Sequence, residues 1–384
     1  MKKKEFTALG VMSGTSIDGI DISLIKSDGF AYFSSILDSY YEFEDYLKSK
    51  LIDLRNKINS LNDIDKYSSE LTKLEREFTL FHARIINEIL KDYSGTVDLI
   101  GFHGQTIYHN PEKKISLQLG DGKLLSQLTK KTVINNFRQN DLNNGGQGAP
   151  LIPIFHKLLI KILEKNFSIS FPINIINIGG ITNVTKIIDN EILSTENIDA
   201  YDIGPGNCLI DEWVRKNSKK YFDENGDLAK SGKVNELVLN QAIENFSNFS
   251  YHKSLDVKDF DISFVRGLSL EDGCATLAKF SAYLISKGLE EINNFDNKFS
   301  KMNILCGGGR KNNFLVKNLR NFLSTSEIEV INIDEYNLNG DYIESQGFGY
   351  LSIRSFLGLP ISFPKTTRCK SPTSGGIINK NFEN

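Results

Sequence analysis

The sequence predicts an α/β protein made of two domains with a similar layout. A chain of 384 residues is too long for one ordinary hydrophobic core. Short apolar runs typical of strands alternate with segments of helical period, such as residues 71–89. A strand, a glycine-rich turn and a second strand occur twice, over residues 6–25 and 173–185. This repetition indicates an internally duplicated architecture.

The composition argues against several classes of function. Hydrophobic residues make up 40% of the chain and charged residues 24%, as in soluble globular proteins. The formal charge of −3 provides no electrostatic footprint for nucleic acid or an anionic membrane, and no apolar run approaches the length of a membrane span. The four cysteines are scattered without a C-x-x-C pair, which argues against a zinc site and a disulfide scaffold. We therefore expect a cytoplasmic protein.

The first glycine-rich turn has the chemistry of a phosphate site. Residues 6–11 and 20–25 are predicted to form two strands joined by the segment 13–19, which is dense in hydroxyls and glycines. A plain hairpin turn, the alternative, needs only one glycine and one Asn or Asp. Asp18 and Asp21 would repel a phosphate unless a divalent cation lay between them, so the pattern favours a metal-bound nucleotide. The P-loop pattern is absent.

Polar residues follow a predicted buried strand over residues 97–102. His103, Gln105 and Thr106 come at its carboxyl end, where open α/β sheets bind their ligands. A purely structural role for His103 remains the alternative, because a single histidine is usually a satisfied structural residue.

Two further loops have ligand-binding character. A predicted strand over residues 302–306 runs into three glycines at 307–309, which would let a flat ring lie against the backbone, whereas a tight turn seldom needs three. Residues 201–207 read as a loop leading into a helix that begins near Cys208, so its N–H groups could face an anion.

The central polar segment, residues 137–150, lies between a short strand at 132–134 and an amphipathic helical run. We expect a glycine-rich loop here, with Pro150 at the start of the following helix. The loop contains one acid, Asp141, and one fixed cation, Arg138. Taken alone, this pair is best explained as a solvated ion pair on a polar turn.

Together, the motifs resemble the sugar kinase, actin and Hsp70 superfamily, in which two RNase H-like domains close on ATP. More narrowly, five segments resemble the anhydro-N-acetylmuramic acid kinase family. They are GVMSGTSIDGID at 10–21, GFHGQT at 101–106, FRQNDLNNGGQGAP at 137–150, NIGGITN at 177–183 and DIGPGN at 202–207.

The resemblance implies an architecture with a nucleotide cleft between the two domains. We expect the first domain over residues 1–135 and the second over 136–344, with residues 345–384 packing back on the first. Two departures from the family pattern occur near the C-terminus. Residues 345–347 read Ser-Gln-Gly where Ala-x-Ala is expected, and Arg368 replaces a usual glycine.

The activity implied by the resemblance is an ATP-dependent conversion of 1,6-anhydro-N-acetylmuramic acid to N-acetylmuramic acid 6-phosphate, in the recycling of cell-wall amino sugars. Asp141 falls on the family's catalytic base. The expected partners are the sugar, ATP and Mg²⁺, without nucleic acid or membrane, and a homodimer is left open. A kinase for another sugar and a nucleotide-binding switch are the alternatives.

The resemblance and the motifs together assign roles to named residues. Asp18 is the expected Mg²⁺ ligand. The expected nucleotide contacts are Gly14, Thr15, Ser16, Ile17, Asp18, Gly19, Ile20, Asp21, Gly179, Gly180, Thr182, Asn183, Gly307, Gly308, Gly309 and Asn312. The expected sugar contacts are His103, Gln105, Thr106, Arg138, Asp202, Gly204 and Glu344.

Overall fold

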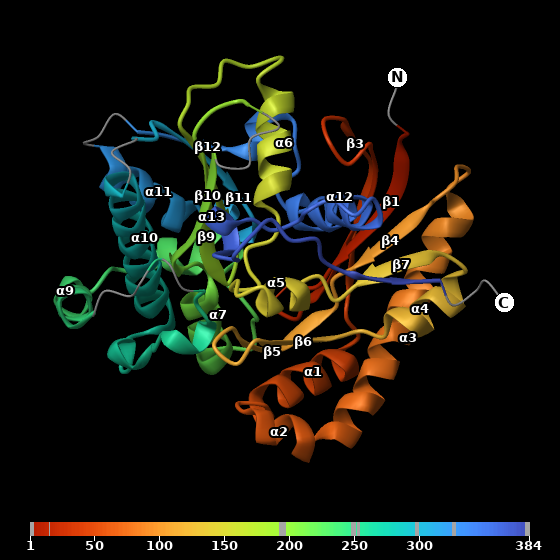
Figure 1. Ribbon diagram of the computed structural model, residues 1–384. Coiled ribbons are helices and arrows are strands. Elements are labelled where there is room, and N and C mark those ends of the chain that lie inside the picture. Colours follow the sequence, from red (N-terminus) through yellow and green to blue (C-terminus); the bar gives the residue numbers. More distant parts are fainter. Residues whose placement is uncertain are drawn as a thin grey trace. The chain divides into compact units, whose positions relative to one another are not determined.

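The computed structural model describes residues 4–14, 16–191, 197–246, 251, 254–295, 299–324 and 328–380. The chain divides into two compact units (Figure 1), one within Met1–Leu159 and Tyr342–Asn384 and the other within Ile160–Asp341. The division falls later in the chain than the boundary expected at residue 135. The segment 136–159 therefore groups with the first unit, because it packs with that unit's own elements.

The first unit is built on a six-stranded mixed sheet of order β13-β7-β4-β1-β2-β3. The three strands β1, β2 and β3 form an antiparallel meander, while β4 runs parallel to β1 and β7 parallel to β4. A short strand, β13, closes the edge antiparallel to β7. The strands span Phe6–Met12 (β1), Gly19–Ser27 (β2), Phe33–Glu42 (β3), Leu99–Phe102 (β4), Thr132–Asn135 (β7) and Ile377–Asn379 (β13).

The second unit repeats this topology in a five-stranded sheet of order β10-β9-β8-β11-β12. The strands β8, β9 and β10 form the antiparallel meander, and β11 and β12 follow in parallel beside β8. They span Ile173–Ile178 (β8), Ile181–Ile187 (β9), Ile198–Pro205 (β10), Met302–Cys306 (β11) and Glu329–Asn332 (β12). The predicted α/β fold class, with two sheets of duplicated layout, is confirmed.

Helices cover both faces of the first sheet. Alternate residues of β1, such as Leu9 and Val11, share a buried core with α1 and α3. The opposite face packs against α12, so closely that a Cβ atom on Gly10 would overlap the carbonyl oxygen of Ser345. The helices span Asp45–Lys57 (α1), Leu61–Lys66 (α2), Ser68–Asp92 (α3), Gly122–Thr129 (α4) and Ile343–Phe356 (α12), and a separate hairpin is formed by Gln105–Asn110 (β5) and Ile115–Leu119 (β6).

Polar partners accommodate the sequence Ser-Gln-Gly at 345–347. The Ser345 hydroxyl lies 2.7 Å from that of Ser23, and Gln346 Nε2 donates to both carboxylate oxygens of Asp38 at 3.1 and 3.0 Å. A Cβ atom on Gly347 would lie 2.7 Å from Ile152 Cγ2. The departure from the family pattern at this helix is therefore matched by its local neighbours.

In the second unit, the long helix α10 is the centre of the core. Trp213, on α7, packs in this core and donates from Nε1 to the carbonyl of Leu270 at 3.0 Å. The helix α6 contains the residue at which the two units divide. The helices span Pro153–Leu163 (α6), Cys208–Asn217 (α7), Asp227–Ser231 (α8), Glu236–Asn245 (α9), Leu270–Asn294 (α10) and Asn313–Leu323 (α11). Within the described ranges, none of the helices is long and apolar enough to cross a membrane.

The chain after residue 357 contains three prolines and has no sequence pattern that predicts a helix or strand, but it does form two short elements. The short helix α13 (Pro364–Thr367) and strand β13 both lie there, and neither is long enough to show a period. Arg368 follows α13 in the left-handed conformation, with φ of 66°. Glycine is the residue that takes this conformation without a Cβ penalty, so the left-handed φ suits the glycine that the resemblance leads us to expect at this position.

We predict that Arg368→Gly stabilises the fold, because relief of the left-handed strain, about 1–2 kcal/mol, exceeds the entropy that glycine adds to the unfolded chain, about 0.4–1 kcal/mol. The midpoint of urea unfolding should therefore rise for Arg368→Gly. The control variant Arg368→Ala, which removes the same side chain but keeps the Cβ atom, should show no rise. Equal midpoints for the two variants would contradict the explanation.

Candidate active site

Asp141 is buried and held by hydrogen bonds, not solvated. The polar segment was predicted as a loop, but it contains a short helix, α5 (Gln139–Asn143), on which Asp141 lies. The side chain is 1% exposed. Its Oδ2 accepts from the backbone N–H of Gly148 at 2.7 Å, and its Oδ1 accepts from the Thr367 hydroxyl at 2.6 Å. The five-residue helix is too short to show an apolar period, so no sequence pattern predicts it.

The glycines of this segment are needed for the carboxylate to fit. A Cβ atom on Gly146 would overlap the carboxylate of Asp141, and Gly148 has φ of 72°. The prediction that Pro150 starts the next helix is wrong, since α6 begins at Pro153. A carboxylate offers about four lone-pair sites, so the two bonds onto Asp141 leave acceptor capacity for a ligand or a water molecule.

Arg138 and His103 form a second polar pair in this region. Arg138 donates from NH1 to the carbonyl of Gly148 at 2.8 Å and from NH2 to His103 Nε2 at 2.8 Å. His103 Nδ1 lies 2.7 Å from the carbonyl of Gly104, so this nitrogen carries the proton and Nε2 accepts. Burial, and then the Arg138 guanidinium, hold the pKa of His103 well below its ordinary value of 6.5. His103 is therefore a neutral acceptor that orients Arg138.

Two buried polar atoms near the end of β1 have no hydrogen-bond partner among the described residues. They are Oε1 of Gln105 and the hydroxyl of Ser13. Gln105 Nε2 donates to the carbonyl of Gly14 at 3.1 Å, which ties it to the first hairpin. Thr106 accepts from Gln118 Nε2 at 3.2 Å within the β5–β6 hairpin. Because buried polar atoms are nearly always paired, these atoms of Gln105 and Ser13 are available to a ligand or to a water molecule. Ser13 was not among the predicted site residues, although its hydroxyl was visible in the motif.

The first hairpin is strained at its tip. Ile17 has φ of 55°, which is rare for a β-branched residue, and its side chain is fully buried in the core, as is that of Ile20. Only the backbone of these two residues could therefore contact a nucleotide. Ser16 donates to Asp18 Oδ1 at 2.6 Å. Thr15, also assigned to this site, lies outside the described residues.

Three carboxylates lie near Tyr40 on β3, at the end of the first hairpin. Burial raises the pKa of Tyr40, and the carboxylates of Asp18, Glu42 and Asp21 raise it further. Gly19 permits the close packing, because a Cβ atom there would lie 2.7 Å from the Tyr40 ring. A divalent cation would relieve this concentration of charge.

Asp18 is chemically suited to a shared metal ion. In the part of the chain that the structure describes, no group of three or more His, Cys, Asp or Glu side chains could hold a metal ion alone. Mg²⁺ is commonly bound by one or two carboxylates together with phosphate oxygens. A single aspartate beside a nucleotide therefore fits, and a site made only of protein ligands does not.

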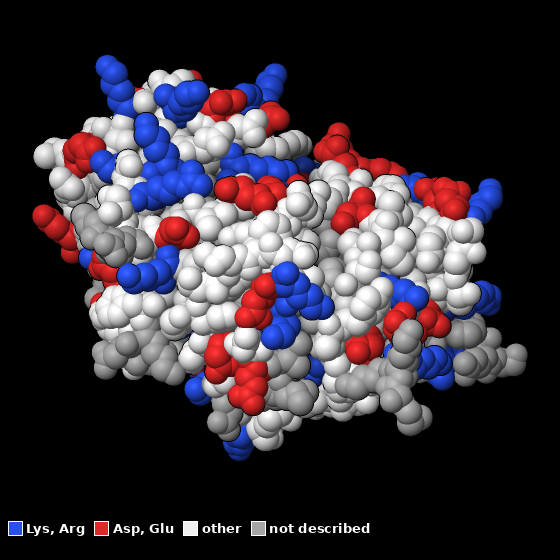
Figure 2. Space-filling model, turned by 90° about the horizontal axis from the view of Figure 1, so that it is seen from above, with Lys and Arg blue, Asp and Glu red and all other residues white. Residues whose placement is uncertain are grey.

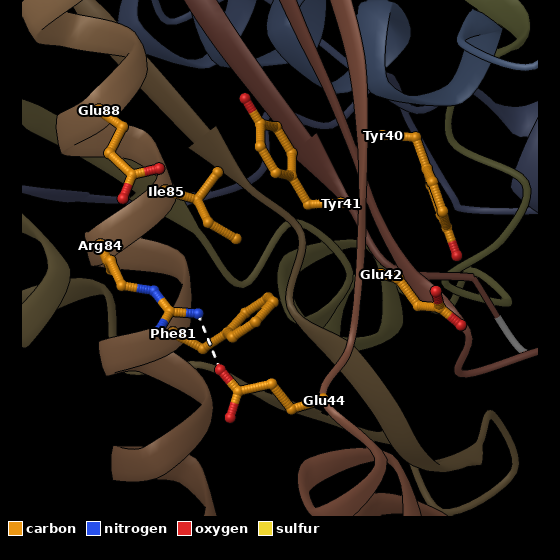
Figure 3. A pocket seen from close by; sticks show the side chains of 8 residues that line it. All are labelled: Tyr40, Tyr41, Glu42, Glu44, Phe81, Arg84, Ile85 and Glu88. Atoms are coloured by element: carbon orange, nitrogen blue, oxygen red, sulfur yellow. Dashed lines mark hydrogen bonds and ion pairs between the residues drawn. The ribbon is translucent and has the colours of Figure 1, made fainter.

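A pocket of about 420 Å³ lies on the first unit, and Asp141 is not among its lining residues. Figure 3 shows its lining side chains, which come from the end of β3 and the turn after it and from α3, with an ion pair of 2.9 Å between Arg84 and Glu44. It contains none of the predicted site residues. Its lining residues are Tyr40, Tyr41, Glu42, Glu44, Phe81, Arg84, Ile85 and Glu88.

The second hairpin packs against the start of α7. The carbonyl of Gly179 accepts from the N–H of Asn207 at 2.8 Å, and that of Gly180 accepts from Gly206 at 2.8 Å and Cys208 at 3.2 Å. These N–H groups are therefore not free to bind an anion, contrary to expectation. The hydroxyl of Thr182 is buried without a described partner, and the neighbouring Asn183 is partly exposed.

Asp202 and Gly204 lie in strand β10, not in the predicted loop. Asp202 Oδ2 accepts from the N–H of Leu255 at 2.8 Å. The glycine-containing sequence suggested a loop, but pairing with β9 holds it extended, with an irregularity between Asp202 and Gly204.

Glu344, the last of the predicted sugar contacts, lies in the first turn of α12 and is partly exposed.

The three glycines after β11 differ in what surrounds them. A Cβ atom on Gly307 would overlap Asn177, and one on Gly309 would overlap Ile178, whereas Gly308 has nothing within 4 Å. Gly308 alone therefore offers open backbone to a flat ring. Asn312 accepts from the N–H of Leu315 at 3.0 Å and caps α11.

Arg310, which the sequence reasoning missed, holds this loop in place. Its guanidinium donates to both oxygens of Asp334 at 2.9 and 3.0 Å, to Asp341 at 2.6 Å and to the carbonyl of Gly307 at 3.0 Å. Burial alone would raise the pKa of Asp341, but hydrogen bonds from Arg310 and Lys311 outweigh it and lower the pKa. In the sequence, only the three preceding glycines indicated that the segment around Arg310 belongs to a candidate site.

On the face that Figure 2 shows, basic and acidic side chains are interspersed among uncharged ones.

The two sheets of one topology, the glycine-rich hairpins and the held carboxylate are the features expected of an α/β sugar kinase. The chain belongs to the anhydro-N-acetylmuramic acid kinase family, since the family model of that description matches residues 6–381.

Full-length relatives support this membership. The chain is 50% identical to the anhydro-N-acetylmuramic acid kinase of Pelagibacter ubique, covering 99% of this chain and 100% of the relative. It is 37% identical to the protein of that name from Brucella canis, covering 96% and 97%. The kinase of the same name from Zymomonas mobilis is 36% identical, with 97% and 99% covered.

We predict that His103 makes folding pH-dependent below neutrality. Well above pH 6.5 it is neutral in both states, but as the pH falls the unfolded chain binds a proton that the folded protein excludes. While the folded protein excludes the proton, the free energy of unfolding falls by up to about 1.4 kcal/mol per pH unit because of this residue. Between pH 7.5 and 5, urea unfolding should show a larger loss for the wild type than for His103→Gln, whose amide oxygen can still accept from Arg138. Equal losses would contradict the assignment of a neutral His103.

Proposed function

We propose that the protein opens the 1,6-anhydro bridge of anhydro-N-acetylmuramic acid with water and phosphorylates O6 at the expense of ATP. The product is N-acetylmuramic acid 6-phosphate, and the reaction belongs to the recycling of cell-wall amino sugars. The observation that carries the proposal is the Asp141 carboxylate, buried in the segment 137–150 and fixed by two donors. The names of the relatives agree with this substrate.

The proposed reaction needs only one protein base. Water attacks C1 while Asp141 takes one of its protons, and the bond between C1 and O6 breaks. The released O6 accepts the γ-phosphoryl group of ATP, and ADP leaves. A glycosidase needs a second carboxyl group to protonate the departing oxygen, whereas here the phosphoryl group takes that place.

The remaining polar groups serve binding and orientation in this proposal. Arg138, oriented by neutral His103, contributes a positive charge, and the unpaired atoms of Gln105 and Ser13 supply hydrogen bonds to the ligand. Gly308 offers open backbone for the adenine side of the nucleotide. Mg²⁺, held by Asp18, would neutralise the phosphate charge that develops during transfer.

We predict that Asp141→Asn folds normally but loses at least about 100-fold in turnover, the lower range of what a positioned base contributes. The measurement is ADP release with anhydro-N-acetylmuramic acid, compared with ordinary hexosamines as acceptors. Asp223→Asn is a matched control, because this buried aspartate accepts two backbone N–H bonds, at 2.7 and 3.0 Å, at the start of α8. Wild-type turnover in Asp141→Asn would remove this residue from the mechanism.

A second prediction concerns the metal. Asp18→Asn should raise the Mg²⁺ concentration needed for half-maximal turnover about tenfold, because one charged ligand of the ion is lost. The neighbouring carboxylate variant Glu42→Gln should leave this requirement unchanged, although it also reduces the negative charge near Tyr40. If both variants shift the requirement equally, Asp18 acts only through the general field and does not ligate the ion.

A further inference from the structure

The C-terminal segment after α12 is hydrogen-bonded to the residues that follow α5, the short helix that contains Asp141. The carbonyl of Thr367 accepts from the N–H of Gln147 at 2.6 Å, and the N–H of Lys370 donates to the carbonyl of Asn144 at 3.0 Å. The Asn144 side chain donates in turn to the carbonyl of Ser371 at 2.9 Å. The segment 137–150 is therefore held in place by residues more than 200 positions later in the sequence.

One side chain of this segment reaches the carboxylate itself. Thr367 is fully buried as the last residue of α13, and its hydroxyl lies 2.6 Å from Asp141 Oδ1. The carbonyl of Phe363 is a second acceptor within reach, at 3.4 Å. A hydroxyl has one hydrogen, and the shorter distance to a charged acceptor favours Asp141.

The hydrogen bond from Thr367 restricts the rotation of the Asp141 carboxylate about its terminal torsion. The terminal torsion of an aspartate is broad and roughly two-fold, so packing of the carbon chain alone leaves it loosely defined. Gly148 donates to one oxygen and Thr367 to the other, and together they set the plane of the carboxylate. A base that takes a proton from an attacking water depends on this plane, because its remaining lone pairs must point at the water.

We propose that Thr367 is a positioning residue of the reaction, whose hydroxyl fixes the orientation of the Asp141 carboxylate. This inference rests on the proposed function, in which Asp141 is the base. The short helix α13 that carries Thr367 is itself held by hydrogen bonds. The Thr366 hydroxyl accepts from the N–H of Phe363 and donates to its carbonyl, both at 3.1 Å.

The adjacent Thr366 provides a matched control. It is 3% exposed, lies on the same short helix and also has a buried hydroxyl, but its hydrogen bonds go to Phe363 and not to Asp141. Thr367→Val and Thr366→Val therefore both remove a buried hydroxyl without changing side-chain shape much, and both should lower the unfolding midpoint. Only the first should change the chemistry.

The experiment measures kcat and KM for both substrates in these variants. For Thr367→Val we expect kcat to fall roughly 10- to 100-fold, the scale of a small misplacement of a reacting group, with both KM values within about twofold of the wild type. Thr367→Ser, which keeps the hydroxyl, should retain kcat within about threefold. Thr366→Val should retain kcat as well. If Thr367→Val does not fold, Thr367→Cys, whose thiol is a weak donor, should still show the selective loss of kcat.

A double-mutant comparison separates positioning from a general structural effect. In the Asp141→Asn background, Thr367→Val should leave the residual turnover unchanged, because groups that act as a unit are not additive. The inference is overturned if Thr367→Val keeps wild-type kcat, if Thr366→Val loses as much, or if the loss persists in the Asp141→Asn background. Absence of sugar-dependent turnover in the wild type would instead refute the proposed function, and the inference with it.

Discussion

The hydrogen bonds that Gly148 and Thr367 donate to Asp141 are the constraint on which the account depends. They explain how a carboxylate that is 1% exposed can remain in the interior, since a buried charge without partners would be costly. They also account for the composition of the surrounding segment. Any side chain at Gly146 would displace the carboxylate, so glycines here serve the geometry of one acid.

Glycines also permit close contact between backbone segments elsewhere in the chain. In the first unit, α12 lies almost directly on the backbone of β1, which only a glycine at position 10 permits. In the second unit, Gly307 and Gly309 let the loop after β11 pack against the end of β8. Buried Arg310 fixes that loop through its ion pairs with Asp334 and Asp341. The glycine-rich motifs thus have two roles, in packing and in leaving backbone open.

The sequence predicted what is encoded locally. Both hairpins and the strands that deliver His103 and Gly307 follow from short patterns of apolar residues and glycines. The expectation that Asp141 is the base came instead from the family resemblance, because its local pattern alone indicated a solvated ion pair. Contacts between distant segments could not be predicted. Thr367 reaches Asp141 across 226 positions, and the burial of Arg310 depends on two acids that look solvated in the sequence. Asp202 was misplaced in a loop because its neighbouring glycines conceal a strand that pairing holds extended.

The central claim is that Asp141 readies a water molecule for attack on the bridged sugar. The most direct measurement is a crystal structure with the anhydro sugar and a non-hydrolysable ATP analogue. We expect a water molecule within about 2.6–3.2 Å of an Asp141 carboxylate oxygen and about 3–3.5 Å from C1 of the sugar. A sugar bound with C1 turned away from Asp141, or with no water between them, would contradict it.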